Sequence, residues 1–106
     1  MIERKSLPDY LSSITNGKER FQREMERLKS YRWRWIVVEA DFSDIVTGAY
    51  QSCVNPNAAI GLTAAYSVRH APVFFASNHA HAGIIVERLL LMCWKQIQDE
   101  RAAGGK

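Results

Sequence analysis

Two residues near the start of the chain, Glu3 and Lys5, have the types and the spacing that act on a phosphodiester. Residues two apart in a β-strand project from the same face, so the carboxylate and the ammonium would lie side by side. A carboxylate can hold a divalent cation, and a lysine beside it can steady the attacking water or the charge that builds on phosphorus. The pair therefore indicates metal-dependent cleavage of phosphodiester bonds.

A purely structural interpretation of the same residues stays open. Glu3 and Lys5 would then lie on an exposed edge strand, and Asp9 would stabilise a helix start. An acidic residue in the first turn of a helix is favoured by the macrodipole whatever the protein does. An isolated Glu-x-Lys is a weak signal, whereas the longer string E-R-K-x-x-x-D, on a strand followed at once by a helix, is much more specific.

The elements that must position these side chains follow directly in the sequence. Met1 to Lys5 is predicted to be a strand because a helix start comes after it: Ser6 is a suitable cap and Pro8 falls in the first turn. That helix is expected to run to about Ile14, where a Thr-Asn-Gly turn ends it. The motif would thus lie on a strand and on the first turn of the next helix.

The rest of the chain alternates helices with short apolar strands. The clearest strand runs from Trp33 to Glu39 and reads as buried on both faces. The other predicted elements are a helix from Lys18 to about Ser30, a helix from Asn55 to about Arg69, a strand from Val73 to Ala76, and a helix from a Ser77 or Asn78 cap to about Glu100. The connection after Glu39 has room for a short helical turn. The order β-α-α-β-α-β-α predicts parallel strands in an α/β layered fold.

Composition narrows the class of protein. The chain has 106 residues, 47% of them hydrophobic, which predicts one compact domain over residues 1–100 with a flexible tail at 101–106. The net charge of +3 is compatible with a nucleic-acid partner. Cys53 and Cys93 form no metal-type pair, so both are expected to be reduced core thiols in a cytoplasmic protein, nucleoid-associated if its source is prokaryotic. The sequence shows no signal peptide and no apolar stretch long enough to span a membrane, so no membrane partner is expected.

The string Glu3-Arg4-Lys5-Ser6-Leu7-Pro8-Asp9 resembles the core of the nuclease motif of the XPF/Mus family of structure-specific DNA endonucleases, written Gly-Asp, a variable gap, then E-R-K-x-x-x-D. Further likeness lies in the serine-rich helix end and asparagine-glycine turn at 12–17, in Arg20-Phe21, in the strand at 35–39, in the strand at 73–76 and in the final helix. The resemblance covers nearly the whole chain and is looser beyond Glu39. It implies a restriction-endonuclease-like fold, with a central mixed sheet flanked by helices.

The resemblance also implies chemistry. Members of the family cut branched or flapped DNA with Mg²⁺ or Mn²⁺. By position, Glu3 would be a metal ligand, and Lys5 would act on the water or on the transition-state charge. Arg4 would serve the scissile phosphate or hold the site together. Asp9 would be a metal or outer carboxylate that faces back toward Glu3.

The sequence departs from the family pattern upstream of Glu3, where neither the Gly-Asp segment nor the earlier acidic strand is present. We therefore expect an amino-terminally truncated nuclease domain. The alternative is a catalytically degenerate DNA-binding or dimerisation domain of the same fold. The tandem helix-hairpin-helix tail that many members carry also has no counterpart here.

Several residues outside the motif have two interpretations each. Glu39, at the end of its strand, would be either an outer carboxylate of the metal site or a salt-bridge partner. Arg20, Arg23 and Arg27 would either contact DNA phosphates or form a solvated helix face. The pair His79 and His81, near a helix start, is expected to be capping or surface residues that share no metal.

The last predicted helix is apolar over a wide arc that includes Ile84, Leu90 and Met92. Part of this arc must face the sheet, and the excess is typical of a subunit interface. The family resemblance likewise implies a homodimer or heterodimer.

Overall fold

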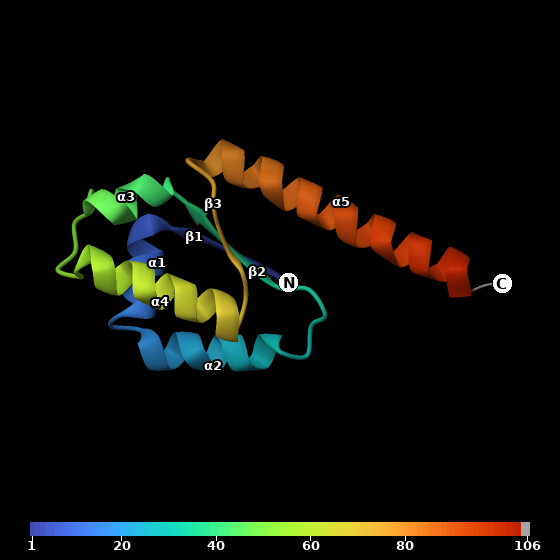
Figure 1. Ribbon diagram of the computed structural model, residues 1–106, viewed down its shortest axis with the longest axis horizontal. Coiled ribbons are helices and arrows are strands. Elements are labelled where there is room, and N and C mark those ends of the chain that lie inside the picture. The colour runs from blue at the N-terminus through green and yellow to red at the C-terminus, as the bar shows by residue number, and fades with distance from the viewer. Residues whose placement is uncertain (105–106) are drawn as a thin grey trace.

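The chain alternates strands and helices in the order β-α-α-β-α-α-β-α (Figure 1). This computed structural model describes residues 1–104. The elements are β1 (Ile2–Ser6), α1 (Leu7–Ile14), α2 (Lys18–Leu28), β2 (Trp35–Glu39), α3 (Phe42–Thr47), α4 (Pro56–Arg69), β3 (Val73–Phe75) and α5 (His79–Gly104).

The sheet has three strands in the order β1-β2-β3, and both pairings are parallel. Glu3 lies opposite Ile36 and Lys5 lies opposite Val38. The central strand β2 is fully buried at Ile36, Val37 and Val38, as its apolar run predicts. The predicted α/β class with parallel neighbours is confirmed. The mixed sheet implied by the resemblance is not seen among residues 1–104, because helices connect every strand to the next and so return the chain to the same end.

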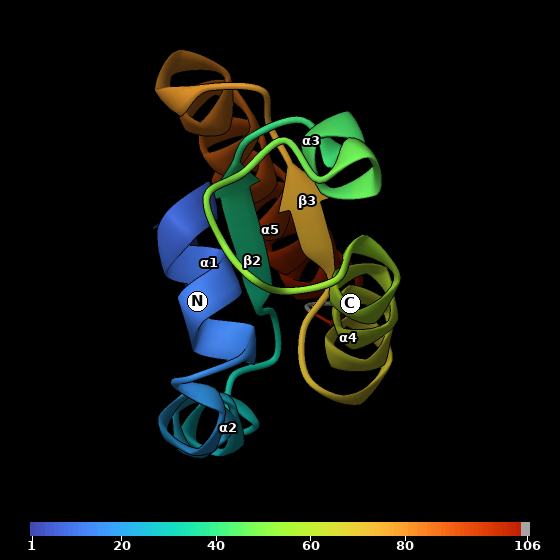
Figure 2. The same cartoon turned by 90° about the vertical axis from the view of Figure 1, so that its left-hand side faces the viewer.

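The sheet is covered unequally on its two faces (Figure 2). Helices α1, α2 and α4 pack on one face, and α5 alone crosses the other. The core between the sheet and the three helices contains Tyr10, Leu11, Ile14, Phe21, Met25, Leu28, Ile36, Val38, Ala59 and Tyr66. Val37 points the other way, toward the α5 side, where Ala82 is also fully buried.

The predicted element order is wrong by one helix, because α3 follows β2 where the prediction allowed only a short helical turn. A capping box starts α3: the Asp41 side chain accepts from the backbone of Asp44, and the Asp44 side chain accepts from the backbone of Asp41. Gly48, at φ 71°, ends it in the left-handed conformation. Local capping signals therefore suffice for a helix of 6 residues without a long apolar pattern.

The other helix starts agree with prediction. The Ser6 hydroxyl accepts from the Asp9 backbone N–H at 3.3 Å, and Asn55 caps α4 in the same way. Asn78, rather than Ser77, caps α5, since its Oδ1 accepts from the N–H of the residue three positions on, at 2.9 Å. Helix α5 continues past the expected end at Glu100 to Gly104, and residues 105–106 of the expected tail lie outside the described residues.

Helix α5 extends well beyond the sheet and makes the molecule long, 56 Å against 28 and 17 Å (Figure 1). Its far end is tied back by Arg32, whose Nη1 donates to Glu100 Oε2 at 2.8 Å and whose Nη2 pairs with the other oxygen of that carboxylate. The exposed large apolar residues on α5 are Ile84, Leu90, Leu91, Met92 and Trp94. Among residues 1–104, no helix has the length and apolarity needed to cross a membrane.

The two cysteines are unpaired, but the prediction that both lie in the core is wrong. Cys53 is exposed in the connection between α3 and α4, and Cys93 is half-buried on α5. A cysteine in a surface connection has no apolar layer above it, whatever its intrinsic preference for burial.

Candidate active site

Lys5 lies against the ring of Phe21, with its Nζ 5.2 Å from the ring centroid. Side chains alternate along β1, so Lys5 projects from the same face as Glu3, and Arg4 projects from the other face. The face with Lys5 is the one that α2 covers. Helix α2 presents Phe21 to the sheet because Phe21, Met25 and Leu28 form its buried stripe. The ammonium is therefore held by an aromatic face.

A pocket of about 330 Å³ brings together four of the predicted site residues, and it is lined by Arg4, Lys5, Asp9, Ser12, Ser13, Gly17, Arg20, Phe21 and Glu24. The pocket lies beside β1, between the first turn of α1 and the start of α2. Arg20 Nε lies 3.6 Å from Glu24 Oε1, a pair one helical turn apart. Three cations and two carboxylates thus line one cavity, which gives it a positive balance suited to a phosphate.

Of the four predicted catalytic residues, Glu3 is the one that does not line this pocket. It is half-buried on β1, on the same face as Lys5. Among residues 1–104, no ion pair joins Glu3 to Lys5. That Asp9 faces back toward Glu3 stays a prediction. Glu3 and Asp9 are oxygen donors of the kind that Mg²⁺ and Mn²⁺ prefer, and Mg²⁺ sites often use one or two carboxylates with waters and phosphates. No group of three or more metal-binding side chains occurs in the described part of the chain.

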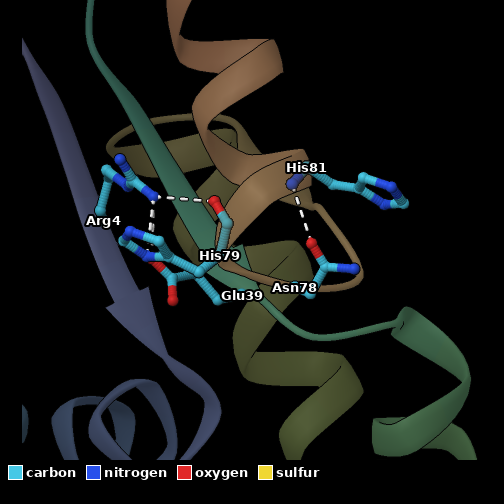
Figure 3. Close-up of polar contacts among 5 residues, drawn as sticks. All are labelled: Arg4, Glu39, Asn78, His79 and His81. Carbon is cyan, nitrogen blue, oxygen red and sulfur yellow. Dashed lines mark hydrogen bonds and ion pairs between the residues drawn. The ribbon is translucent and has the colours of Figure 1, made fainter.

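Arg4 points to the opposite face of the sheet, toward the start of α5 (Figure 3). Its Nη2 lies 3.1 Å from Glu39 Oε1, 3.1 Å from His79 Nδ1 and 3.1 Å from the His79 carbonyl oxygen. His79 Nδ1 lies 2.9 Å from the same oxygen of Glu39. We call Arg4, Glu39 and His79 the arginine cluster; it joins β1, β2 and α5.

The arginine cluster stabilises the charged form of Glu39. The hydrogen bond from His79, followed by the contact with Arg4, holds the pKa of the Glu39 carboxyl below its ordinary value. Of the two interpretations of Glu39, the structure shows the ion pair. A role in an outer shell around a metal stays a prediction.

His79 is a residue that sequence reasoning missed, since it was expected only to cap a helix or to lie at the surface. It is exposed, as expected, but its ring contacts the arginine of the nuclease-like motif. The signal available was its position: in a parallel sheet, the helix after β3 begins at the same edge where β2 ends with Glu39. The His81 side chain points away from the cluster (Figure 3), and the expectation that the two histidines share no metal stays a prediction.

The three candidate DNA-binding arginines follow one another along one side of α2. Arg20 lines the pocket with Lys5, and it also lines a neighbouring pocket of about 470 Å³ together with Arg23. Arg23 and Arg27 line a shallow cavity of about 910 Å³ with Arg69 and His70 at the end of α4. Glu19 and Glu26 also border this shallow cavity, and Glu26 is paired with Lys29 at 2.9 Å. Burial lowers the pKa of the His70 imidazole, which favours its neutral form. We call Arg23, Arg27 and Arg69 the second arginine surface.

One protein-family model matches this chain. The family model of the ERCC4 domain matches residues 1–89, from β1 to the middle of α5, and so includes the pocket and the arginine cluster. No curated protein matches the chain. ERCC4 domains are nuclease-type domains that process DNA, and the match spans well over half of the 106 residues. The chain therefore belongs to the ERCC4 domain family, the nuclease domain of the XPF/Mus endonucleases.

Proposed function

We propose that this ERCC4 domain provides the lysine side of a metal-dependent site that hydrolyses DNA phosphodiester bonds. The observation that carries the proposal is the shared pocket of Arg4, Lys5, Asp9 and Arg20. Its cations can bind a phosphate, and its lysine ammonium is held in place by a ring rather than by a carboxylate. Among residues 1–104 no carboxylate forms an ion pair with Lys5, so its charge is available for a substrate oxygen.

In this proposal each side chain has one task. Lys5 stabilises the attacking water or the charge on phosphorus, and Arg4 and Arg20 bind the phosphate. Glu3 and Asp9 would hold Mg²⁺ or Mn²⁺, which supplies charge neutralisation and a more acidic water. The three parallel strands and their helices support a partial restriction-endonuclease-like core, which we include in the proposal.

A nuclease assay on branched and flapped DNA with Mn²⁺ tests the proposal. We expect the chain to cut, and Glu3→Ala and Lys5→Ala each to abolish cutting. Glu87→Ala and Lys95→Ala are matched controls on the exposed face of α5. Both variants should still cut DNA, since neither residue lines the pocket. Cleavage that survives both Glu3→Ala and Lys5→Ala would falsify the proposal.

A second candidate function is a DNA-binding domain that has lost catalysis. It is favoured by one observation, the lack of a group of three or more metal-binding side chains within residues 1–104. Salt-sensitive DNA binding without cleavage by the wild-type chain would select this candidate. A chain that neither cuts nor binds DNA would instead be a protein-interaction domain.

We also propose that the domain pairs with a second ERCC4-type subunit. The exposed apolar residues Leu90, Leu91 and Trp94 on α5 support this, because a monomer gains nothing from such a surface in water. Light scattering after size-exclusion chromatography should give the mass of a dimer. Leu91→Glu combined with Trp94→Glu should shift that mass to a monomer, and a monomeric mass for the wild type would contradict the pairing.

A further inference from the structure

We infer that His79 is a positioning residue for Arg4, setting where the guanidinium of the nuclease motif points; this rests on the proposed function in taking Arg4 as the phosphate-binding group. The contact crosses the sheet from the start of α5 to β1 (Figure 3). It involves both the ring and the carbonyl of His79, each 3.1 Å from Arg4 Nη2.

The ring nitrogen of His79 cannot serve both of its neighbours at once. Nδ1 lies 3.1 Å from Arg4 Nη2, which is always a donor, and 2.9 Å from Glu39 Oε1, which is an acceptor when ionised. With its lone pair free, Nδ1 accepts from Arg4. With a proton on it, Nδ1 donates to Glu39 and has no lone pair left to accept from Arg4. The cluster therefore has two arrangements of hydrogen bonds that differ in how Arg4 is held.

Only two charged groups take part in these two arrangements of hydrogen bonds. The charged groups that face the ring of His79 are Arg4 from β1 and Glu39 from β2, whereas His81 on its own helix points away. The side chain of Glu39 is 20% exposed and that of Arg4 is 33% exposed, whereas that of His79 is 81% exposed. Because Arg4 and His79 both contact Glu39 Oε1, a change in the hydrogen bond of His79 also changes the contacts of Arg4.

The remaining donors of Arg4 are available to a substrate. Only Nη2 makes hydrogen bonds among residues 1–104, and Arg4 also lines the pocket that contains Lys5. Holding one corner of a guanidinium fixes its plane and lowers the entropy cost when the other nitrogens bind a phosphate. His79 would thereby prepare Arg4 without touching DNA.

The test follows Arg4 directly and needs no catalysis. In the full chain labelled with ¹⁵N, the guanidinium resonances of Arg4 are followed from pH 5 to 8 together with the His79 ring signals. We expect the Arg4 shift to follow the His79 titration in the wild type. In His79→Ala this dependence should vanish. In His79→Asn, whose amide stands roughly where Nδ1 stands, Arg4 should keep its ordered signal but lose the pH dependence.

Binding of a short DNA duplex, read by fluorescence anisotropy, is the second arm. We expect His79→Ala to weaken binding by up to about tenfold, the scale of one hydrogen bond, and His79→Asn to restore most of it. His81→Ala is the control that changes neither readout. An Arg4 resonance that ignores the His79 titration, or that is the same in His79→Ala, overturns the inference. If no form of the chain binds DNA, the proposed function fails, while the resonances still decide whether His79 positions Arg4.

Discussion

Lys5 and Arg4, neighbours in the sequence, are held by opposite layers of the molecule. The Lys5 ammonium lies over the Phe21 ring of α2, and the Arg4 guanidinium lies against Glu39 and His79 on the α5 side. The alternation of a β-strand is the cause, since adjacent side chains project from opposite faces. The edge position of β1 lets both side chains reach the same pocket nonetheless.

Replacing Lys5 with Met should separate stability from chemistry. The methionine keeps an apolar stem on Phe21 and removes the charge, so the free energy of unfolding should fall by no more than about 1 kcal/mol, the worth of a cation–π contact. DNA cleavage should be abolished. Urea unfolding and the nuclease assay measure the two effects, with Lys95→Met as the exposed control. A loss of several kcal/mol would mean that Lys5 is chiefly structural.

The buried hydroxyls of Tyr10 and Thr63 should be energetically coupled. Tyr10 donates to Thr63 Oγ1 at 2.7 Å, because that hydroxyl already donates to the carbonyl of Ala59 at 2.8 Å. Tyr10→Phe should cost about 1 kcal/mol of stability, since it removes one buried hydrogen bond between α1 and α4. A double-mutant cycle with Thr63→Val should return a coupling of similar size. Strict additivity of the two substitutions would argue against the bond.

Two glycines should respond in opposite directions to alanine. Gly48 ends α3 at φ 71°, and an added Cβ would lie 3.3 Å from Pro56 Cγ, so Gly48→Ala should destabilise by about 1 kcal/mol or more. Gly61 lies within α4 with nothing within 4 Å of an added Cβ, and Gly61→Ala should stabilise by about 0.5–1 kcal/mol. Thermal unfolding measures both. Equal changes would show that backbone conformation does not govern these positions.

The ion pair between Arg32 and Glu100, near the end of α5, should make the free energy of unfolding depend on pH in the acid range. Hydrogen bonds from Arg32 and then Gln96 lower the pKa of Glu100 to about 2 in the folded chain, below its ordinary value of 4.5. A depressed folded-state pKa contributes stability above the unfolded-state pKa, and that stability is lost as the pH falls from about 4.5 toward 2. Glu100→Gln should therefore be less stable than the wild type at pH 7, and the difference should shrink below pH 4.5.

Denaturant unfolding at a series of pH values measures this difference. Glu87→Gln on the same helix is the control, because Glu87 is exposed and has no ion-pair partner in the described part of the chain. A difference that stays constant from pH 7 to pH 2.5 would contradict the assignment of the Glu100 pKa to its contact with Arg32.

The second arginine surface should contribute salt-dependent affinity for DNA. Arg23 and Arg27 line it together with Arg69. Alanine at Arg23 and Arg27 together should lower the slope of log K against log salt by up to about two, roughly one for each phosphate that an arginine no longer neutralises. Arg88→Ala with Arg101→Ala on α5 should leave the slope unchanged. Fluorescence anisotropy over a salt series provides the slopes. Equal slopes in all variants would mean that the second arginine surface does not contact DNA phosphates.

Local signals predicted most of the elements. Ser6, Asn55 and Asn78 cap the helices that they precede, and the apolar run of β2 is buried on both faces. Helix α3 was missed although Asp41 and Asp44 form a capping box, because a helix of 6 residues has too few turns to show a period. Lys5 was predicted as a site residue from its spacing to Glu3 and from the longer E-R-K-x-x-x-D string, but its contact with the ring of Phe21 was not predicted.

The sequence by itself determined that the E-R-K-x-x-x-D string lies on a strand followed by a capped helix, because caps, turns and periodicity act over a few residues. Only the tertiary structure decided which side chains meet. Arg4 reaches Glu39 across 35 residues and His79 across 75, and Lys5 meets the ring of Phe21 from another element. Such contacts depend on the order of the strands and on which helix covers which face, and no local pattern encodes either.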